Sequence, residues 1–462
     1  MTVETRSYEM KEIQGDMMTP ISIYHSLNGT KKMLFESSAK HEESGRYSFI
    51  ALNPIAELTG DQLGYTFSYT KGDTEKGSTS VIEKLKNLLP IHPENYQFTF
   101  FGGAIGYFGY ETAFYHEKIG ELLSDELEMP DIHLMFYDTF IIFDHLKQIV
   151  TIAAIDLFQN GRTQQEMSDA IDKIYTDLMQ NSKLQEDTDI KLAFQSKIEE
   201  SAFIEMVEKA KEHIVKGDIF QVVLSQRFSS PFEGNPFALY RQLRTSNPSP
   251  YMFYMDFEKY TILGTSPESL VKVNNGLVTT NPIAGTKPRG KTKEEDIQIA
   301  KDLLNDEKEI AEHRMLVDLG RNDIGRISEI GSVQIEKYMT IEYYKYVMHI
   351  VSEVTGRLKE DLHILDVLTA CLPAGTVSGA PKIRAMQIIN ELETTKRGVY
   401  AGAVGYISVT GNMDLALAIR TMVVKDNQAY VQAGAGIVHD SVPKSEFEET
   451  INKAKALLEV QR

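Results

Sequence analysis

The sequence has 462 residues, a single cysteine and no long apolar run. A lone Cys371 excludes an internal disulfide and a cysteine-rich metal site. No stretch approaches the ~18 uncharged apolar residues of a membrane-spanning helix. The amino-terminal segment MTVETRSYEM lacks the basic region and apolar run of a secretory signal. We therefore expect a cytoplasmic protein without a membrane partner.

Positive charge is also scarce, with 48 Lys and Arg against 66 Asp and Glu, for a net charge of −18. Nothing in the sequence resembles a basic stripe, so we expect no nucleic-acid partner. An acidic surface also repels small anions at long range. A site for an anionic substrate would therefore have to be locally positive or hold a metal ion.

Common nucleotide-binding motifs are missing. The glycine-rich segments are FFGGAIGYFGYE (100–111), AGAVGYISV (401–409) and AGAGIVHD (433–440). None has GxGxxG opening a helix, and no Walker A sequence occurs, so dinucleotide and P-loop functions are excluded. Glycines inside strands are more typical of a bulge or of close backbone approach.

The length predicts two domains or one large composite body. Strand-like runs dominate the first 150 residues, and a polar helix is expected at about 164–179. The charged stretch 180–191 is the best linker candidate. Helices and strands then mix without regular βαβ alternation, which favours an α+β fold with mostly antiparallel sheets. We expect an amino-terminal domain at 1–185 and a catalytic domain at 197–462.

Two pairs of glutamates share the spacing E-x-x-E. Glu309 and Glu312 form one pair, and Glu446 and Glu449 form the other. This spacing places both members on one helical face. Two facing helices of this kind could hold one Mg²⁺, which takes one or two carboxylates and keeps several waters. However, Glu449 four residues before Lys453 is equally typical of a solvated helix, which is the better interpretation from spacing alone.

The ends of these two helices are also predicted from local signals. Ser445 followed by Glu448 has the spacing of a capping box, so the last helix should begin there. The helix that carries Glu309 should end near Gly320, because glycine commonly terminates helices.

Several longer motifs occur in a characteristic order. They are NPIAGTKPRG (281–290), HRMLVDLGRNDIGR (313–326), CLPAGTVSGAPKIRAM (371–386), YAGAVGY (400–406), LAIRTMV (417–423), QAGAGIV (432–438) and EFEET (446–450). In this order they resemble the chorismate-utilising enzymes and, within that family, the large synthase components of anthranilate synthases. The resemblance covers nearly the whole chain and is strongest from about 200 to 456.

The resemblance implies a fold, a metal ion and a substrate. The fold is α+β, with large, mostly antiparallel sheets packed face to face and helices outside. The substrate is chorismate, a dicarboxylate, and the cofactor is Mg²⁺. Glu312 and Glu449 would ligate the metal, while Glu309 and Glu446 would act through metal-bound waters. Lys453 would lie near the ring carboxylate of chorismate.

The same resemblance assigns an acid and a base. Glu268, in GTSPESL, matches the general acid on the departing ring hydroxyl, and Thr376 would hydrogen-bond near that hydroxyl. A carboxyl that donates a proton near neutral pH needs a raised pKa, which burial can supply. His349 matches the base that removes a ring proton. By its spacing alone, His349 would be a satisfied core histidine on the strand face of Val347 and Val351.

Three groups would bind the pyruvyl carboxylate: the side chains of Tyr400 and Arg420 and the backbone N–H of Gly436. Arginine suits a planar carboxylate because it can donate two parallel hydrogen bonds.

Two positions separate this chain from sister enzymes. Isochorismate and salicylate synthases have a water-activating lysine where this chain has Gln221, which indicates ammonia as the nucleophile. Aminodeoxychorismate synthases usually have a nucleophilic lysine where this chain has Ala284, which cannot attack the ring. The implied reaction converts chorismate and ammonia to anthranilate and pyruvate. The alternatives are an aminodeoxychorismate synthase and a catalytically silent, tryptophan-binding regulatory subunit.

The source of ammonia lies outside this chain. Cys371 has no Cys/His/Asp arrangement around it, and we expect a small buried residue. Ammonia would come from solution or from a separate glutamine amidotransferase subunit, in a heterodimer or heterotetramer.

Two segments resemble the feedback site of the family. LFESSAKHEESGRYSFI (34–50) resembles the segment that binds tryptophan as an inhibitor, and NPSPYMFYM (247–255) resembles the second wall of that pocket. The matching residues are Glu36, Ser37, Pro250 and Tyr251, with Phe35 in place of the commoner leucine. The second segment is also typical of a proline-containing turn that leads into a strand.

Overall fold

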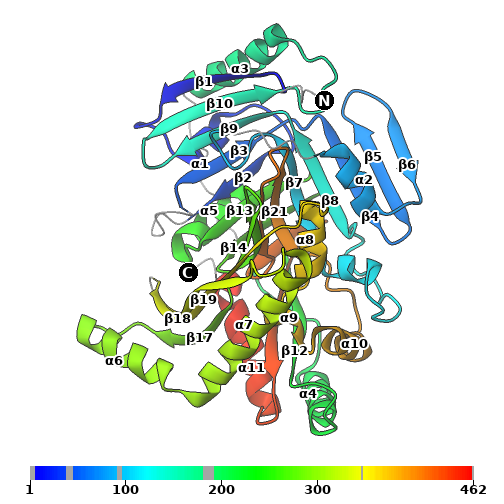
Figure 1. Ribbon diagram of the computed structural model, residues 1–462, viewed down its shortest axis with the longest axis vertical. Coiled ribbons are helices and arrows are strands. Elements are labelled where there is room, and N and C mark those ends of the chain that lie inside the picture. The colour runs from blue at the N-terminus through cyan, green and yellow to red at the C-terminus, as the bar shows by residue number, and fades with distance from the viewer. Residues whose placement is uncertain (1–5, 38–44, 91–95, 181–191, 345–346, 460–462) are drawn as a thin grey trace.

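The computed structural model describes residues 6–37, 45–90, 96–180, 192–344 and 347–459. Within these residues, two 12-stranded sheets make up most of the molecule (Figure 1). In spatial order, the first sheet consists of β1 (Tyr8–Gln14), β10 (Ile149–Ile155), β9 (Thr139–Asp144), β3 (Tyr47–Ala51), β2 (Met33–Glu36), β13 (Tyr251–Asp256), β14 (Tyr260–Ser266), β23 (Thr421–Lys425), β24 (Gln428–Ile437), β12 (Gln221–Pro231) and β11 (Gln195–Ser196), with β20 (Gly379–Ala380) paired to β12.

The second sheet is equally long. Its strands are β17 (Ile283–Pro288), β19 (Val347–Arg357), β16 (Leu277–Thr280), β15 (Ser269–Asn274), β22 (Met413–Leu417), β21 (Ala403–Ser408), β7 (Gly103–Phe108), β8 (Ile132–Tyr137), β4 (Ala56–Asp61), β5 (Gly64–Tyr69) and β6 (Thr74–Gly77), with β18 (Gln334–Tyr343) paired to β19. Neighbouring strands pair antiparallel, as β12 does with β24 and β17 does with β19. The expected α+β fold with large antiparallel sheets is confirmed.

The helices lie outside the sheets. They are α1 (Pro20–Ser26), α2 (Val81–Leu88), η1 (Tyr110–Tyr115), α3 (Gln164–Met179), α4 (Glu200–Val215), α5 (Pro236–Ser246), α6 (Lys293–Leu304), α7 (Glu307–Ile327), α8 (Ile364–Cys371), α9 (Gly375–Ser378), α10 (Lys382–Leu392) and α11 (Pro443–Leu458). In Figure 1, α3 covers the end of the first sheet near β1 and β10, while α4, α7, α10 and α11 gather at the opposite end of the molecule. None of the helices in the described residues is long and apolar enough to span a membrane.

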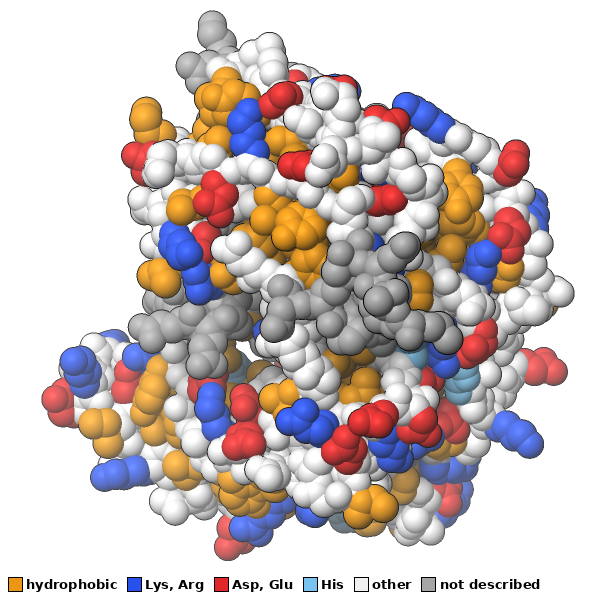
Figure 2. Space-filling model, turned by 45° about the horizontal axis from the view of Figure 1, so that its top comes forward, with side chains coloured by type: hydrophobic (Ala, Val, Ile, Leu, Met, Phe, Trp, Pro, Cys, Tyr) orange, Lys and Arg blue, Asp and Glu red, His pale blue; other side chains and the backbone are white. Residues whose placement is uncertain are grey.

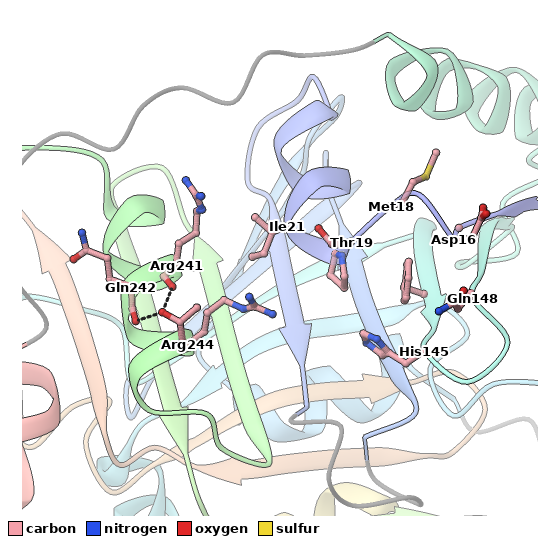
Figure 3. A pocket seen from close by; sticks show the side chains of 13 residues that line it. Asp16, Met18, Thr19, Ile21, His145, Gln148, Arg241, Gln242 and Arg244 are labelled. Carbon is pink, nitrogen blue, oxygen red and sulfur yellow. Dashed lines mark hydrogen bonds between the residues drawn. The ribbon is translucent and has the colours of Figure 1, made fainter. Parts of the chain in front are cut away.

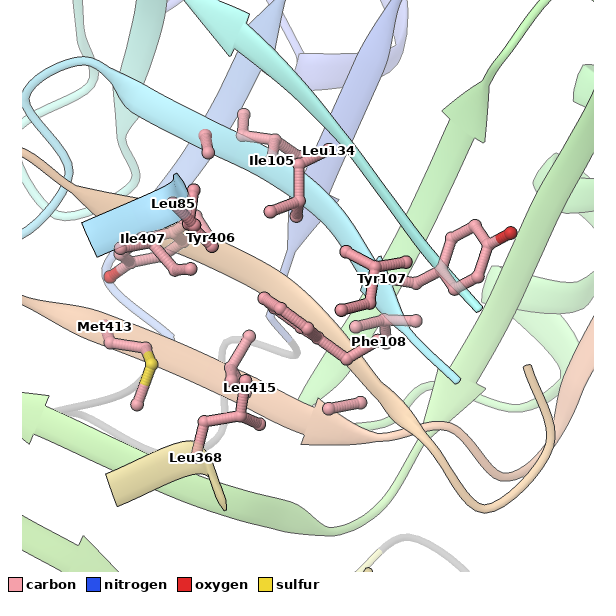
Figure 4. Close-up of a cluster of buried hydrophobic side chains, with 14 of the residues drawn as sticks. Leu85, Ile105, Tyr107, Phe108, Leu134, Leu368, Tyr406, Ile407, Met413 and Leu415 are labelled. Atoms are coloured by element: carbon pink, nitrogen blue, oxygen red, sulfur yellow. The ribbon is translucent and has the colours of Figure 1, made fainter. Parts of the chain in front are cut away.

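Aromatic side chains join the two sheets. The ring of Phe49 in β3 lies 5.5 Å, between centroids, from the ring of Tyr406 in β21. On the outer side of the second sheet, β7, β8, β21 and β22 pack against α2 and α8 (Figure 4). Leu415 of β22 and Leu368 of α8 are both fully buried in that cluster. The core therefore continues from between the sheets to the helices that cover the second sheet.

Each sheet draws strands from both sides of the expected linker. In the first sheet β2 pairs with β13, and in the second sheet β7 pairs with β21. Residues 181–191 lie outside the described residues, so most of the linker predicted at 180–191 is not described. The division into domains at 1–185 and 197–462 stays a prediction about segments of the chain.

The predicted polar helix agrees with the structure, and the two predicted helix ends do not. The predicted polar helix is α3, and α4 ends before Gly217, whose φ of +81° leads the chain toward β12. The prediction of a capping box formed by Ser445 and Glu448 is wrong. Helix α11 begins at Pro443 after Val442 without a side-chain cap, because proline is already shaped for the first helical position.

The predicted end of the α7 helix at Gly320 is also wrong, because α7 continues to Ile327. A Cβ atom at Gly320 would lie only 3.2 Å from Thr280 Cγ2 and 3.4 Å from Pro282 Cγ. The glycine therefore allows a close approach of the helix to the second sheet and does not terminate the helix.

Charged side chains of both signs lie intermixed on the face shown in Figure 2. The described residues on that face form no continuous basic stripe, which agrees with the net charge of −18 over the full sequence.

Candidate active site

A cavity of about 590 Å³ opens where the two sheets and their helices meet. Helix α7 packs on β17 and β19 of the second sheet, and α11 packs on β24 of the first. The cavity brings together every residue predicted for catalysis, for substrate binding and for the metal: Gln221, Glu268, Glu309, Glu312, His349, Thr376, Tyr400, Arg420, Gly436, Glu446, Glu449 and Lys453. These residues come from segments up to 232 positions apart (453 − 221), so the chain fold assembles the site.

The predicted acid lies between β14 and β15. Thr376, from the short helix α9, donates a hydrogen bond of 2.8 Å from Oγ1 to Glu268 Oε1. Burial raises the pKa of Glu268 to about 7, and the hydrogen bond from Thr376 opposes that rise. A carboxyl with this pKa is protonated in a large fraction of molecules at neutral pH, so it can act as a general acid.

The predicted base lies in β19. His349 is 8% exposed, and its Nδ1 atom lies 3.0 Å from Thr286 Oγ1 of β17. A register shift between Ala284 and Thr286, with Gly285 at φ +65°, gives β17 a bulge beside the histidine. Burial, and then the positive charge of Arg420, lower the pKa of His349 to about 4. The imidazole is therefore neutral at pH 7 and can accept a proton.

Thr286 was not identified from the sequence as a site residue. Thr286 is the threonine of the motif NPIAGTKPRG, and the pairing of β17 with β19 places it opposite His349. The motif therefore contained the signal, but only the strand register shows which residue it contacts.

The groups predicted to bind a carboxylate also face the cavity. Burial raises the pKa of Tyr400 to about 12, which keeps its phenol protonated as a hydrogen-bond donor. Arg420 has a φ of +48°, a backbone conformation that is uncommon outside glycine and is concentrated at functional sites. A Cβ atom at Gly434 would lie 2.7 Å from the Tyr400 hydroxyl, so the glycine allows the phenol to lie against β24.

Gln221 is the first residue of β12. Its Nε2 atom donates a weak hydrogen bond of 3.4 Å to Glu312 Oε1. Among the described residues, its buried Oε1 atom has no hydrogen-bond partner. A Cβ atom at position 436 would lie 2.5 Å from Nε2, so Gly436 is needed for the amide to lie there. This wall of the cavity thus carries a neutral amide with one free acceptor.

The two acidic helices, α7 and α11, both contribute carboxylates to the lining of the cavity. Burial and then the charge of Glu312 raise the pKa of Glu309, and burial together with the charge of Glu449 raises the pKa of Glu446. Like-charge repulsion of this kind is relieved by a cation.

The structure does not bring these carboxylates together as a formed metal site. Among the described residues, no group of three or more acidic, histidine or cysteine side chains is close enough to hold a metal ion. Lys453 instead pairs with Glu449 at 2.7 Å and donates to the carbonyl oxygen of Gly434 at 3.1 Å. The donor chemistry fits Mg²⁺, whereas the ligand set stays a prediction.

The four residues predicted for tryptophan lie at one end of the β2–β13 pair, where Glu36 stands opposite Met252. Glu36 is buried and accepts hydrogen bonds from Arg244 at 2.8 and 2.9 Å. Pro250 directly precedes β13, and the Tyr251 hydroxyl donates to Asp414 at 3.0 Å. The Ser37 hydroxyl is buried and has no hydrogen-bond partner among the described residues. Residues 38–44 of the first segment lie outside the described residues.

A separate cavity of about 600 Å³ lies near this region (Figure 3). Arg244 and His145 face it from α5 and from the end of β9, and Ile21 and Thr19 belong to its wall near α1. The residues that line it do not include the four predicted for tryptophan. Arg244 pairs with Glu36 of β2, so this cavity adjoins β2. It is a different cavity from the predicted inhibitor pocket, because other residues line it.

The remaining cysteine is buried, as expected. Cys371 is 4% exposed, and burial raises the pKa of its thiol to about 12. A thiol that stays protonated is a poor nucleophile, so Cys371 cannot serve as the nucleophile of a glutaminase.

Together, two antiparallel sheets and a cavity with a buried carboxyl, a buried imidazole and an arginine are the arrangement expected of an α+β enzyme with acid–base chemistry. The model of the chorismate binding enzyme family matches residues 30–459, and the chain belongs to that family.

Individual relatives agree with this membership. The chain is 46% identical over 454 residues to "Anthranilate synthase component 1" of Lactococcus lactis subsp. lactis, covering 98% of this chain and 99% of the relative. It is 46% identical to the crystal structure of anthranilate synthase component I from Streptococcus pneumoniae, with a TM-score of 0.85 and coverage of 97% and 99%. The menaquinone-specific isochorismate synthase of Escherichia coli, at 20% identity, has the same fold with a TM-score of 0.75 and coverage of 99% and 95%.

Proposed function

We propose that the chain is the synthase component of an anthranilate synthase. This lyase would convert chorismate and ammonia to anthranilate, pyruvate and water, as the first committed step of tryptophan biosynthesis. The observation that carries the proposal is the single cavity in which an acid, a neutral base, a carboxylate-binding pair and a neutral amide face one another. The 46% identity to component 1 of the Lactococcus enzyme supports the choice within the family.

Substrate binding would use the positive side of the cavity. Arg420, the Tyr400 hydroxyl and the Gly436 N–H would bind the pyruvyl carboxylate, and Lys453 would bind the ring carboxylate. Glu312 and Glu449 would hold Mg²⁺, with Glu309 and Glu446 acting through its waters. Bound there, the ion would polarise the ring carboxylate and offset the charge of the acidic helices.

The proposed reaction includes two proton transfers, and the positions of Glu268 and His349 in the cavity are compatible with both. Ammonia forms a bond to ring carbon C2, and the C4 hydroxyl leaves as water after Glu268 donates its proton to that oxygen. His349 then removes the proton from C2, and the enolpyruvyl group leaves as pyruvate while the ring becomes aromatic. Thr376 holds the Glu268 carboxyl for the first transfer, and Thr286 lies against the His349 ring for the second.

The nucleophile follows from two side chains. Gln221 is neutral at every pH and cannot act as a general base toward water, although its free Oε1 can accept a hydrogen bond from ammonia. Ala284 has no nucleophilic atom. Ammonia would come from solution or from a glutamine amidotransferase subunit, because the one cysteine of this chain is buried and protonated.

Feedback inhibition by tryptophan is part of the proposal. Its support is the buried Ser37 hydroxyl, which has no hydrogen-bond partner among the described residues, since such an atom is a place for a ligand to donate or accept. Pro250 and Glu36 would complete the pocket.

The direct test is a fluorescence assay for anthranilate with chorismate, Mg²⁺ and ammonium. We expect anthranilate, with no isochorismate or 4-amino-4-deoxychorismate accumulating in chromatography of the products. Glutamine should replace ammonium only after the amidotransferase subunit is added. Either of the other two compounds as the main product would transfer the proposal to a sister enzyme, and no product at all would favour a silent regulatory subunit.

A further inference from the structure

A buried arginine lies behind the wall of the active-site cavity. Arg397 is 2% exposed and does not line the cavity itself. Arg397 lies after α10, in the segment that leads to Tyr400. Its side chain is among the largest fully buried side chains of the described residues. Burying a charge is costly unless it is paired and hydrogen-bonded, so its contacts need an explanation.

Those contacts reach three different parts of the cavity wall. The Nη1 atom donates to the Val377 carbonyl at 2.8 Å, and Nη2 donates to the Val223 carbonyl at 2.7 Å. The guanidinium carbon also lies 5.6 Å from the centroid of the Tyr400 ring. Val223, Val377 and Tyr400 all line the cavity. One side chain therefore touches β12, α9 and the segment before β21.

A carboxylate fixes the orientation of this guanidinium. Nε donates to Glu393 Oε2 at 2.8 Å, and Nη2 donates to Glu393 Oε1 at 2.6 Å. Glu393 is anchored in turn by Ser225 of β12, whose backbone N–H and hydroxyl each donate to Oε1 at 2.9 Å. The Tyr110 ring, 4.8 Å from the guanidinium carbon, packs against the same group.

Only arginine can make this set of contacts. Its planar fork offers five N–H donors in fixed directions, and here they meet a carboxylate and two carbonyls at once. A lysine would keep the charge and could reach one or two of these partners. It would not hold the two carbonyls and stack on the Tyr400 ring at the same time.

We propose that Arg397 is a positioning residue that sets the Tyr400 phenol and the adjoining cavity wall for binding the carboxylate of the substrate. The Tyr400 ring lies between the guanidinium and Gly434, whose missing Cβ leaves room for the hydroxyl. A shift of Arg397 would move the phenol relative to Arg420, which lines the same cavity. The inference rests on the proposed function for the identity of the substrate, and on the contacts of Arg397 for its role.

The expected signature separates positioning from stability alone. Tyr400 would bind the carboxylate in the ground state and the transition state alike, so its displacement should raise KM with little change in kcat. We expect Arg397→Lys to raise KM for chorismate at least ~10-fold, the ~1.4 kcal/mol that separates a well-placed charge-assisted hydrogen bond from a lost one. A purely structural role would lower the unfolding temperature and leave KM unchanged.

The experiment compares Arg397→Lys with Arg162→Lys. Arg162 also donates to two backbone carbonyls, of Asp138 and Ile155, and pairs with a carboxylate, but it does not line the cavity or contact its wall. Each variant is measured for thermal unfolding, for kcat and KM with ammonium as nucleophile, and for the Kd of chorismate by calorimetry. We expect both to lose thermal stability and only Arg397→Lys to bind chorismate more weakly.

A double-mutant cycle tests whether the effect passes through Tyr400. In a Tyr400→Phe background, which lacks the hydroxyl, Arg397→Lys should change KM less than ~3-fold, because coupled residues are not additive. Equal effects in both backgrounds, or an unchanged KM in folded Arg397→Lys protein, would overturn the proposal.

Two further results keep the test decisive. If Arg397→Lys does not fold, Glu393→Gln takes its place, because it weakens the anchor of the guanidinium while keeping the side-chain volume. The same rise in KM is expected, and its absence contradicts the proposal. If the unmodified protein binds chorismate but forms no anthranilate, the proposed function fails, whereas the calorimetric comparison still tests Arg397.

Discussion

At the scale of single residues, the site depends on two pKa values that burial moves in opposite directions. Burial disfavours the charged form of each group, so it raises the pKa of Glu268 to about 7 and lowers that of His349 to about 4. The result is a protonated carboxyl and a neutral imidazole in the same cavity at the same pH. Such a pair can give one proton and take another without a metal-bound base.

The pKa of Glu268 predicts how kcat/KM falls on the alkaline side of the pH profile. Glu268 must be protonated, so kcat/KM for chorismate should fall as the pH rises through about 7, measured at a fixed concentration of free ammonia. Thr376 donates its hydrogen bond to the carboxylate and so favours the charged form. Thr376→Val should therefore raise the pKa of Glu268 and move this fall to higher pH, while Thr376→Ser should leave it in place. A fall that stays fixed or moves to lower pH in Thr376→Val would contradict the assignment of Glu268.

At the scale of elements, the cavity depends on two helices that pack on different sheets. Helix α7 packs on the second sheet and carries Glu309 and Glu312. Helix α11 packs on the first sheet and carries Glu446 and Glu449. Neither helix alone offers more than one E-x-x-E pair to the cavity. A cation between them would therefore also hold the two sheets together at this end of the molecule.

The metal prediction follows from that arrangement. Glu312→Gln or Glu449→Gln should lower Mg²⁺-dependent turnover by at least ~100-fold, because loss of even an outer partner commonly costs ~10–100-fold. Binding of Mg²⁺ in the presence of chorismate, measured by calorimetry, should weaken in parallel. The matched controls are Glu307→Gln and Glu448→Gln, which change exposed positions on the same helices. Normal activity and Mg²⁺ affinity in either ligand variant would remove both helices from the metal site.

The packing of β22 against α8 gives a prediction about stability. Leu415 is fully buried and lies beside Leu368 in Figure 4. Leu415→Ala should lower the free energy of unfolding by ~2–5 kcal/mol, as is usual for removing a buried leucine side chain. Leu63→Ala, at a position that is 85% exposed, should change it by less than ~0.5 kcal/mol. Urea unfolding measures both, and equal small effects would show that β22 is not part of the main core.

At the scale of the whole molecule, the proposed inhibitor pocket lies where the two sheets touch. Tyr251 of the first sheet donates to Asp414 of the second, and Asp414 belongs to β22, which leads directly to Arg420 in the active-site cavity. A ligand at this junction can favour one relative placement of the sheets. It does so only by its differential affinity for the two placements.

Reciprocity tests this coupling. Tryptophan should weaken the binding of chorismate by ~5–150-fold, and chorismate should weaken the binding of tryptophan by the same factor. Ser37→Arg should fill the pocket and give an active enzyme that resists tryptophan, whereas Ser78→Arg, at an exposed position, should be inhibited like the parent. Calorimetry of the two ligands, alone and together, measures the coupling. Independent binding, or inhibition of Ser37→Arg like that of the parent, would leave Ser37 as an ordinary core residue.

The sequence by itself determined the fold class, some of the helices and strands, and the chemical types in the site. Strand-like runs, helical spacing and the residues of each motif are local properties, so they can be recognised without knowing what packs against them. Glu268, His349 and Arg420 were identified through the resemblance of their motifs to the chorismate-utilising enzymes, and all three line the cavity. The sequence also argued against a glutaminase, since its only cysteine, Cys371, has no Cys/His/Asp arrangement around it.

Tertiary structure alone decided how these residues meet. Gly320 looked like a helix end and is a close contact with Thr280, and Thr286 became a partner of His349 only through strand register. Arg397 carries no local signal, because its contacts join residues 20 and 174 positions away in the chain. The pKa values of the acid and base likewise depend on burial, and burial is a property of everything packed around a group, which no short stretch of sequence contains.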